Sequence, residues 1–446
     1  MVSTNEVTLA AIEAARERVR EFVRLTPTIA SQALTDRAGT AVTLKLENLQ
    51  RTGSFKVRGA NNMLASLDVL PPGVVAASAG NHAQAVALAA TQRGIASTVV
   101  MPMGAPAAKQ QACRGYGATI ELVEGSLAAC QTRARELATE RGLLYIPPYD
   151  SPEIIAGQGT LGLELLEQEP ELQTILVPAG GGGLLAGVAI AVKSRRPDVR
   201  VIGVQSTAMN GIVASLGAGA PVAMLPRDTI ADGVAVAGPS ELTLELIERY
   251  VDDVVDVDEE SIARAIVFLL ERARVVAEGA GALAVAALMS GKIEPSGATP
   301  GAGTTPGTGK MSSAGTTPGA GRMSSAGTTV AVISGGNIDV NLLDRLVDRG
   351  LVADGRRKRL TVATANVPGE LVRISGAMAE ARANIVQVEH DLAAPDLPVG
   401  VSRITLVIEL PQAEVYERVR EHLIAAGLSE AELTDFQTSA AANRPS

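Results

Sequence analysis

Aromatic side chains are scarce in this chain of 446 residues: Trp is absent, and Phe, Tyr and Trp together make up 2% of the sequence. The apolar share of 46% must therefore come mainly from aliphatic side chains, and the length allows two or three domains. Few rings are available to stack on the bases of single-stranded nucleic acid. The net charge of −9 leaves no basic excess for a phosphate backbone. We therefore expect no nucleic-acid partner.

Cysteine and histidine are also rare, with two and three copies. Cys113 and Cys130 have no metal-ligand spacing, so we expect two buried thiols rather than a zinc site or a disulfide framework. The first twenty positions carry charges instead of the apolar core of a secretory signal, and no run of about eighteen uncharged apolar residues follows. The sequence predicts a cytoplasmic protein with no membrane partner.

The periodicity of apolar residues predicts an α/β protein. Residues 8–24 have helical spacing and predict an amphipathic opening helix. Short β-branched runs then alternate with Ala-rich helical stretches, as is typical of open, mostly parallel, twisted sheets. The predicted strands are Val42–Leu46, Val74–Ala77, Thr98–Met101, Thr119–Val123, Thr174–Val177, Val201–Val204 and Val330–Ile333.

A low-complexity insertion occupies residues 296–328, where a twelve-residue unit occurs as TTPGTGKMSSAG and again as TTPGAGRMSSAG. Its few large apolar side chains predict a mobile surface loop. It contains Gly-Thr-Gly-Lys at 307–310, but a phosphate-binding P-loop needs Gly at the position of Thr304 and Ser or Thr at that of Met311. We therefore reject a P-loop.

A change of pattern near Leu360 predicts a separate small α+β domain of βαββα order. Its predicted elements are a strand at Leu360–Thr364, a helix at Gly369–Ala381, strands at Ile385–His390 and Ser402–Glu409, and a helix at Ala413–Ala425. We thus expect a catalytic region at 1–350, a linker at 351–358, this domain at 359–430 and a tail at 431–446. The basic cluster Arg356–Arg359 is interpreted as part of a solvated linker.

Lys56 lies between Phe55 and Val57 in the segment Gly53–Gly59. Apolar neighbours can partly desolvate a lysine, which lowers its pKa and favours the neutral amine of Schiff-base chemistry. On spacing alone this indication is weak, because most lysines on helices are solvated surface residues.

The segment Ser78–Gln84 follows a predicted strand and precedes a predicted helix. Such a turn of small polar residues offers backbone N–H groups and the positive end of the helix dipole, which suit a carboxylate. The alternative is an ordinary turn with Ser78 or Asn81 as the N-cap. For His82 we expect a buried, hydrogen-bonded role rather than a catalytic one.

Four glycines, Gly180–Gly183, join a predicted strand to a predicted helix. Without side chains the backbone can close around a phosphate. The spacing of Gly181, Gly183 and Ala186 also fits a dinucleotide fingerprint, but that site needs an acidic residue where Gln205 stands. We therefore favour an isolated phosphate monoester.

A further strand ends in Ser334-Gly-Gly-Asn, which on its own would be a tight turn. Together these four segments resemble the threonine deaminase branch of the fold-type-II pyridoxal-phosphate enzymes over nearly all of residues 5–350. The resemblance implies that pyridoxal 5′-phosphate is bound and that Lys56 is the catalytic residue. In the implied site, Lys56 bonds to the cofactor, Phe55 lies against its ring and Asn81 contacts its 3′-oxygen. Ser334 faces the ring nitrogen, and the cofactor phosphate is held by Gly180, Gly181, Gly182 and Gly183. The implied substrate contacts are Ser78, Ala79, Gly80, Asn81 and His82.

The reaction implied by the resemblance is α,β-elimination from L-threonine to 2-oxobutanoate and ammonia. Lys56 would take the α-proton and the cofactor phosphate would protonate the leaving hydroxyl. A neutral Ser334 beside the ring nitrogen is consistent with elimination. An L-serine-preferring dehydratase is the alternative, because one methyl group is worth only about 1–3 kcal/mol in a pocket. A third hypothesis is a catalytically dead amino-acid sensor. The presence of Lys56 and Ser334 argues against it.

Three positions differ from related enzymes. Serine racemases carry a second serine where this chain has Ala79, so racemisation is not expected. Relatives with a divalent-cation site carry Glu and Asp where this chain has Gln205 and Gly211, so we expect no magnesium or calcium site.

The C-terminal module resembles an ACT domain, with Asn366–Leu371 opening its first helix and Ala383–Val386 beginning its second strand. The resemblance implies a regulatory site for a small amino acid at the loop of Pro368 and Gly369. The alternative is a dimerisation module without a ligand. The resemblance to the family also implies a homodimer or homotetramer.

Overall fold

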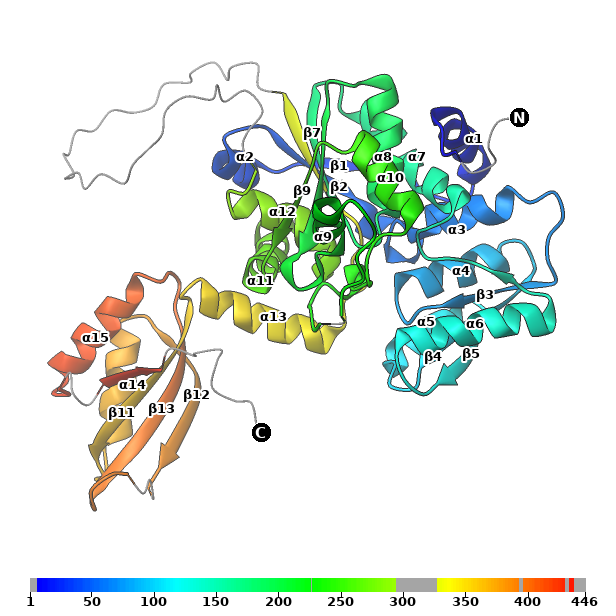
Figure 1. Ribbon diagram of the computed structural model, residues 1–446. Helices are drawn as coiled ribbons and strands as arrows, with labels where there is room; N and C mark the ends of the chain where they lie inside the picture. The colour runs from blue at the N-terminus through cyan, green and yellow to red at the C-terminus, as the bar shows by residue number, and fades with distance from the viewer. Residues whose placement is uncertain (1–5, 226, 294–326, 393–395, 430–432, 437–446) are drawn as a thin grey trace. The chain divides into compact units, whose positions relative to one another are not determined.

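A computed structural model of the chain contains two compact units, Met1–Asp339 and Val340–Ser446. It describes residues 6–225, 227–293, 327–392, 396–429 and 433–436. The first unit has two sheets and the second has one (Figure 1). Each unit has its own buried core, so each is described by itself.

Among the described residues, the larger sheet of the first unit has six strands in the order β1-β2-β10-β7-β8-β9. β1 is antiparallel to β2, and the other neighbouring pairs are parallel. Helices α8 (Gly183–Arg195) and α12 (Gly279–Met289) cover its two faces (Figure 1). The strands are β1 (Thr28–Ala30), β2 (Val42–Leu46), β7 (Leu172–Pro178), β8 (Arg200–Ser206), β9 (Asp253–Val257) and β10 (Thr328–Ile333).

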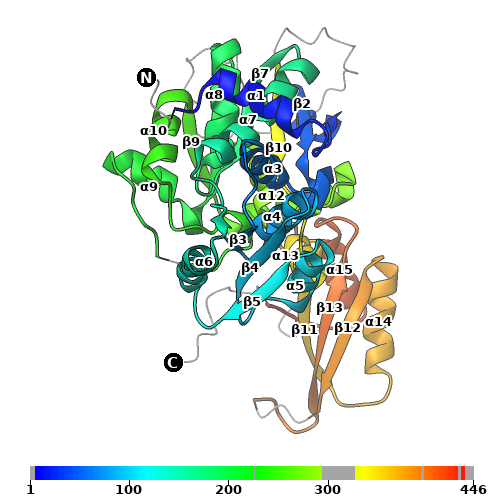
Figure 2. The ribbon, with the colours of Figure 1, turned by 90° about the vertical axis from the view of Figure 1, so that its right-hand side faces the viewer.

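The smaller sheet has the order β5-β4-β3-β6, and its neighbouring strands are all parallel. Val99 and Met101 of β4 pack with residues of α4 and α5, whereas Val100 packs with residues of α6. Helices α5 and α6 lie on opposite sides of this sheet (Figure 2). β3 is buried on both faces, and such strands form continuous apolar runs, which is why its sequence shows no alternation. The elements are β3 (Gly73–Ala77), α4 (Asn81–Thr91), β4 (Ala96–Pro102), α5 (Ala107–Gly115), β5 (Thr119–Val123), α6 (Leu127–Arg141) and β6 (Leu144–Tyr145).

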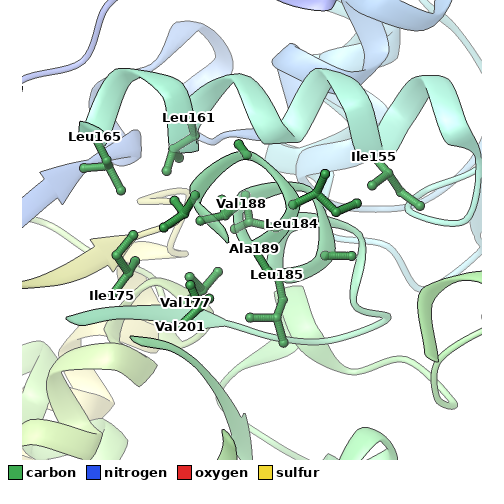
Figure 3. Close-up of a cluster of buried hydrophobic side chains, with 14 of the residues drawn as sticks. Ile155, Leu161, Leu165, Ile175, Val177, Leu184, Leu185, Val188, Ala189 and Val201 are labelled. Atoms are coloured by element: carbon green, nitrogen blue, oxygen red, sulfur yellow. The ribbon is translucent and has the colours of Figure 1, made fainter. Parts of the chain in front are cut away.

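Helix α7 (Pro152–Gln168) lies directly against α3 (Lys56–Ala65) and α8. A Cβ atom added at Gly157 of α7 would lie 2.6 Å from the Cα of Gly59 in α3. One added at Gly187 of α8 would lie 2.7 Å from the backbone nitrogen of Gly159 in α7. The helix backbones can approach this closely because glycine stands at the contacts. Around them, leucines of α7 and aliphatic residues of α8 fill the space above β7 and β8 (Figure 3).

The remaining helical elements of the first unit connect these layers. They are α1 (Leu9–Val19), α2 (Gln32–Ala38), η1 (Glu47–Leu49), η2 (Arg51–Gly53), η3 (Thr207–Met209), α9 (Gly211–Ala218), η4 (Asp232–Val234), α10 (Glu241–Tyr250), α11 (Glu259–Phe268) and the π-helical turn η5 (Leu269–Ala273). Each of the seven predicted strands is present, whereas β1, β6 and β9 were not predicted. Within the described residues, no helix is long and apolar enough to cross a membrane.

The second unit is the expected α+β module, built on an antiparallel sheet of order β12-β13-β11-β14. The predicted βαββα order is followed by β14, which pairs with β11, so the predicted tail at 431–446 is wrong for these four residues. Pairing with the free edge of β11 overrides the weak strand pattern of Leu-Thr-Asp-Phe. The elements are α13 (Val340–Ala353), β11 (Arg357–Ala365), α14 (Glu370–Glu380), β12 (Asn384–Asp391), β13 (Val401–Glu409), α15 (Val415–Ala425) and β14 (Leu433–Phe436).

The division between the units differs from the expected boundary at 350. It falls between Asp339 and Val340, and α13 belongs to the second unit. The expected linker 351–358 contains the end of α13 and the start of β11. Arg357 pairs with Glu409 at 3.6 Å, and the Nζ of Lys358 lies 3.9 Å from the ring centroid of Tyr416. The basic cluster therefore opens a strand.

The predicted insertion 296–328, including the Gly-Thr-Gly-Lys sequence, lies outside the described residues except for its last two positions. These are Gly327 and Thr328, and Thr328 is the first residue of β10.

Gly187→Ala should lower the free energy of unfolding by about 1–3 kcal/mol, because the added methyl group would overpack the α7–α8 contact. Urea unfolding of the purified protein measures the change. Gly217→Ala is the matched control, since Gly217 lies in α9 and an added Cβ there meets nothing within 4 Å. The control should be unchanged or slightly more stable. Equal stability of the two variants would contradict the close helix contact.

Candidate active site

The carboxyl ends of β2, β3, β7 and β10 lead into the four predicted segments. Two adjoining cavities lie where these segments meet, and they share Lys56, Asn81 and Glu278 in their walls. The first cavity is also lined by Phe55, Gly180, Gly181, Gly182, Gly183 and Ser334. The second is also lined by Ser78, Ala79, Gly80 and His82. Every site residue predicted from the sequence therefore lines one of the two cavities.

Lys56 is the first residue of α3 and is half-buried. Its Nζ donates a hydrogen bond of 2.8 Å to the carbonyl oxygen of Pro148 and lies 5.2 Å from the ring centroid of Phe55. Burial lowers the pKa of Lys56 to about 8, against the opposing charges of Glu278 and Asp150. A substantial fraction of the amine is therefore neutral just above pH 7.

Backbone hydrogen bonds tie the Lys56 segment to the loop after β10. The N–H of Phe55 donates to the carbonyl oxygen of Ser334 at 3.1 Å, and the N–H of Gly336 donates to that of Gly53 at 2.9 Å. The position of Lys56 is thus fixed relative to Ser334 by main-chain contacts and not by side-chain packing alone.

A buried ionic cluster anchors α3 two residues after Lys56. Arg58 pairs with Glu47 at 2.8 Å and with Glu164 of α7 at 2.7 Å, and Lys45 of β2 pairs with Glu164 at 2.6 Å. All four residues are buried, and their two positive and two negative charges balance. Removing one member would leave an uncompensated buried charge, which typically costs about 3–5 kcal/mol. The cluster therefore holds α3 against β2 and α7.

The tetraglycine turn leads from β7 into the N-terminus of α8, with Gly182 in the left-handed region at φ 92°. An added Cβ would lie 2.5 Å from ring atoms of Tyr149 at Gly181, and 2.9 Å from the Cα of Val234 at Gly180. Side chains here would fill the cavity beside the first-turn N–H groups of α8, which suit a phosphate. A phosphate cradle and a lysine amine in one cavity fit pyridoxal phosphate.

Two further side chains in the cavity walls, Asn337 and Glu278, were not predicted from the sequence. The Nδ2 of Asn337 donates to the carbonyl oxygen of Thr52 at 2.6 Å and to the Oδ1 of Asn81 at 2.8 Å. The Nδ2 of Asn81 donates in turn to the Oε1 of Glu278 at 2.7 Å. These bonds form a continuous chain of polar groups across the site.

Glu278 is 4% exposed and precedes α12. Burial, assisted by the negative charge of Asp232, raises the pKa of Glu278 to about 7, although the hydrogen bond from Asn81 and the charges of Lys109 and Lys56 oppose the shift. The sequence does contain a signal for this residue: it is the one charged position between 275 and 289. A lone acid in an apolar run has to be paired, neutralised or functional.

The comparisons with known proteins agree with this geometry. Residues 19–300 match the family model described as pyridoxal-phosphate dependent enzyme. This chain belongs to that family. It is 41% identical over 423 residues to the L-threonine ammonia-lyase of Thermotoga maritima, and the alignment covers 94% of this chain and 98% of that protein.

Two solved structures of the family share the fold. Maize serine racemase has a TM-score of 0.68 at 33% identity, covering 78% of this chain and 98% of that one. The processed form of threonine deaminase isoform 2 from Solanum lycopersicum has a TM-score of 0.67 at 34% identity, covering 76% and 92%. The fold-type-II resemblance predicted from the sequence is confirmed.

In the turn Ser78–His82 of this pyridoxal-phosphate enzyme, His82 is 4% exposed and its Nε2 lies 2.9 Å from the carbonyl oxygen of Ile146. Burial, assisted by the charge of Lys56, lowers the pKa of His82 to about 3, so the ring is neutral. The N-cap of α4 is Gly80, which makes no side-chain cap bond, and the Oγ of Ser78 accepts from the N–H of Gly80 at 3.1 Å. The alternative of a side-chain-capped turn is therefore wrong.

Gln205, one of the two positions from which no divalent-cation site was expected, makes hydrogen bonds within the protein. Its Oε1 accepts from the N–H groups of Ile212 at 3.0 Å and Val213 at 3.1 Å, and its Nε2 donates to the carbonyl oxygen of Ala179 at 3.2 Å. In the described parts of the chain, no three His, Cys, Asp or Glu side chains gather to hold a metal ion.

The cofactor-free protein should capture pyridoxal phosphate at a rate that rises with pH about a midpoint near 8, because only the neutral amine of Lys56 attacks an aldehyde. Glu278→Gln should move this midpoint lower, since the lost negative charge no longer raises the pKa of Lys56. Stopped-flow absorbance measures both. Glu17→Gln, at an exposed position of α1, is the control and should leave the midpoint unchanged. A wild-type midpoint of about 10, as for a solvated lysine, would rule out the desolvated site.

Proposed function

We propose that this protein removes water and then ammonia from L-threonine, giving 2-oxobutanoate and ammonium. The observation that carries the proposal is the half-buried amine of Lys56, with its lowered pKa, in the wall shared by both cavities. Support also comes from two similar proteins, the L-threonine ammonia-lyase of Thermotoga maritima and the threonine deaminase of Solanum lycopersicum.

Pyridoxal phosphate, when bound, draws electrons away from the α-carbon of the amino acid attached to it. Five parts of the chain would hold the cofactor. They are Phe55, Lys56, Asn81, Gly180–Gly183 and Ser334. The amine of Lys56 would accept the α-proton at Nζ, because its lowered pKa keeps part of it neutral at physiological pH.

The turn Ser78–His82 would bind the carboxylate of the substrate. It lines the second cavity at the N-terminus of α4, where first-turn N–H groups and the helix dipole attract an anion. A neutral His82 adds no charge there, so orientation of the substrate depends on the turn itself.

Two residues bear on the choice of reaction. Ser334 is 3% exposed, and its neutral hydroxyl would place no negative charge beside the ring nitrogen of a bound cofactor, which favours loss of the β-hydroxyl over a long-lived carbanion. Ala79 lines the second cavity without a hydroxyl that could deliver a proton to the other face of the substrate. We therefore do not extend the activity of the similar maize racemase to this chain.

A preference for L-serine is the alternative, because the two substrates differ by one methyl group. A catalytically dead amino-acid sensor is disfavoured, since Lys56 and Ser334 are both retained and line one cavity.

Formation of 2-oxo acid and ammonium from L-threonine and from L-serine tests the proposal. We expect kcat/KM to be higher for L-threonine by roughly tenfold or more. Lys56→Ala should lower turnover at least about a hundredfold by removing the base, while Lys292→Ala, at an exposed lysine, should not. Full turnover by Lys56→Ala would end the proposal, and a higher kcat/KM for L-serine would select the alternative.

We further propose that the second unit binds a small amino acid, such as a branched-chain product, at the loop Asn366–Leu371. Support comes from the backbone of Gly369, the N-cap of α14 at φ 102°, where an added Cβ would meet nothing within 4 Å. The alternative remains a dimerisation module without a ligand. A homodimer or homotetramer, and a cytoplasmic location, also remain predictions.

Calorimetry of the full chain with isoleucine and with valine tests this effector site. Gly369→Ala should weaken binding about tenfold, because a side chain at φ 102° strains the loop. Gly376→Ala, within α14 at a position with open space, is the matched control and should bind normally. No heat with either amino acid would leave the dimerisation module as the better description.

A further inference from the structure

The hydrogen bonds that link Thr52, Asn337, Asn81 and Glu278 all run in one donor-to-acceptor direction. The carbonyl group of Thr52 fixes this direction. The carbonyl oxygen of Thr52 can only accept, so Asn337 must present its amide nitrogen, at 2.6 Å. The same nitrogen lies 2.8 Å from Asn81, which must therefore present its oxygen. The amide nitrogen of Asn81 is left to face Glu278, at 2.7 Å.

The amide hydrogens of Asn337 and Asn81 can be assigned to their acceptors one by one. The Nδ2 of Asn337 carries two, and both are donated. The Nδ2 of Asn81 also carries two, and one goes to Glu278. For the other, the described residues offer no acceptor, and Asn81 lines both cavities. One N–H of Asn81 is therefore available to a ligand in the site.

The turn that presents the Thr52 carbonyl is unfavourable in itself. Thr52 has φ 63°, a left-handed conformation that costs a residue with a Cβ atom stability, and its buried hydroxyl has no hydrogen-bond partner among the described residues. The next residue is Gly53, where an added Cβ would lie 3.0 Å from the Cγ of Asn337. The backbone here is arranged around the Asn337 amide.

We propose that Asn337 is a positioning residue that fixes the Asn81 amide with an N–H, and not its oxygen, directed at the bound cofactor. A flipped Asn81 would place its oxygen against the Oε1 of Glu278 and leave its nitrogen against Asn337. The inference rests on the proposed contact between Asn81 and the cofactor 3′-oxygen, which as an acceptor requires a donor.

The relative cofactor affinities of two variants distinguish a role of Asn337 as a hydrogen-bond donor from a role in packing. Asn337→Asp keeps the size of the side chain but, when ionised, donates to neither Thr52 nor Asn81. Asn337→Ala removes the side chain and lets the Asn81 amide rotate. If the donors matter, the aspartate variant binds the cofactor more weakly than the alanine variant. A role in packing alone predicts the opposite order.

Titration of the cofactor-free variants with pyridoxal phosphate, followed by visible absorbance, measures the dissociation constants. We expect a rise of roughly tenfold for Asn337→Ala and roughly a hundredfold for Asn337→Asp, with a shifted absorbance maximum of the bound cofactor. Asn62→Asp is the matched control. Asn62 is buried in α3 and its Nδ2 donates to the carbonyl oxygen of Glu153 at 2.7 Å, so the same change occurs away from both cavities. Its dissociation constant should stay within about twofold of the wild type.

Wild-type affinity in Asn337→Asp, or weaker binding by Asn337→Ala than by Asn337→Asp, would overturn the proposal. If Asn337→Asp does not fold, equal affinities of Asn337→Ala and Asn62→Ala would overturn it instead. Asn81→Ala tests the contact between Asn81 and the cofactor separately from the role of Asn337. Full affinity in that variant refutes the proposed cofactor contact itself, whereas reduced affinity there with wild-type affinity in Asn337→Asp refutes only the role of Asn337.

Discussion

The direct contact of the α7 backbone with α3 and α8 is the constraint on which the site depends. Glycines at Gly157, Gly159 and Gly187 remove the side chains that would hold these helices apart. α3 begins at Lys56 and α8 begins at Gly183 of the tetraglycine turn, so α7 sets the separation between the amine and the phosphate cradle. Packed interiors do not deform continuously, so this separation is fixed before any ligand binds.

Burial acts in opposite directions on the two ionisable groups at the centre of this frame. It lowers the pKa of Lys56 to about 8 and raises that of Glu278 to about 7, because a low dielectric disfavours either charge. Each group also opposes the shift of the other. Both therefore titrate near physiological pH, where a small change in their surroundings moves a proton. The net charge of the cavity therefore depends on the burial of Lys56 and Glu278 as well as on which ionisable residues line it.

Local signals explain what the sequence could predict. The seven predicted strands contain runs of β-branched and other apolar residues, and the tetraglycine turn, the Ser78–Gln84 turn and Ser334 come shortly after the ends of three of them. β1 and β6 have three and two residues, too few for a pattern, and β14 is defined by its pairing with β11. The boundary of the second unit was misplaced because the amphipathic pattern of α13 does not reveal to which unit the helix belongs.

The two missed site residues differ in how visible they could have been. Asn81 is separated along the chain by 197 residues from Glu278 and by 256 from Asn337, so neither contact leaves a local pattern. A carboxylate in an apolar run is nevertheless costly to bury, so Glu278 could have been suspected from its isolation alone. An amide after two glycines carries no such cost in a turn, where Asn is common. The role of Asn337 becomes visible only when the acceptor at Thr52 is known, because that carbonyl fixes the direction of every bond after it.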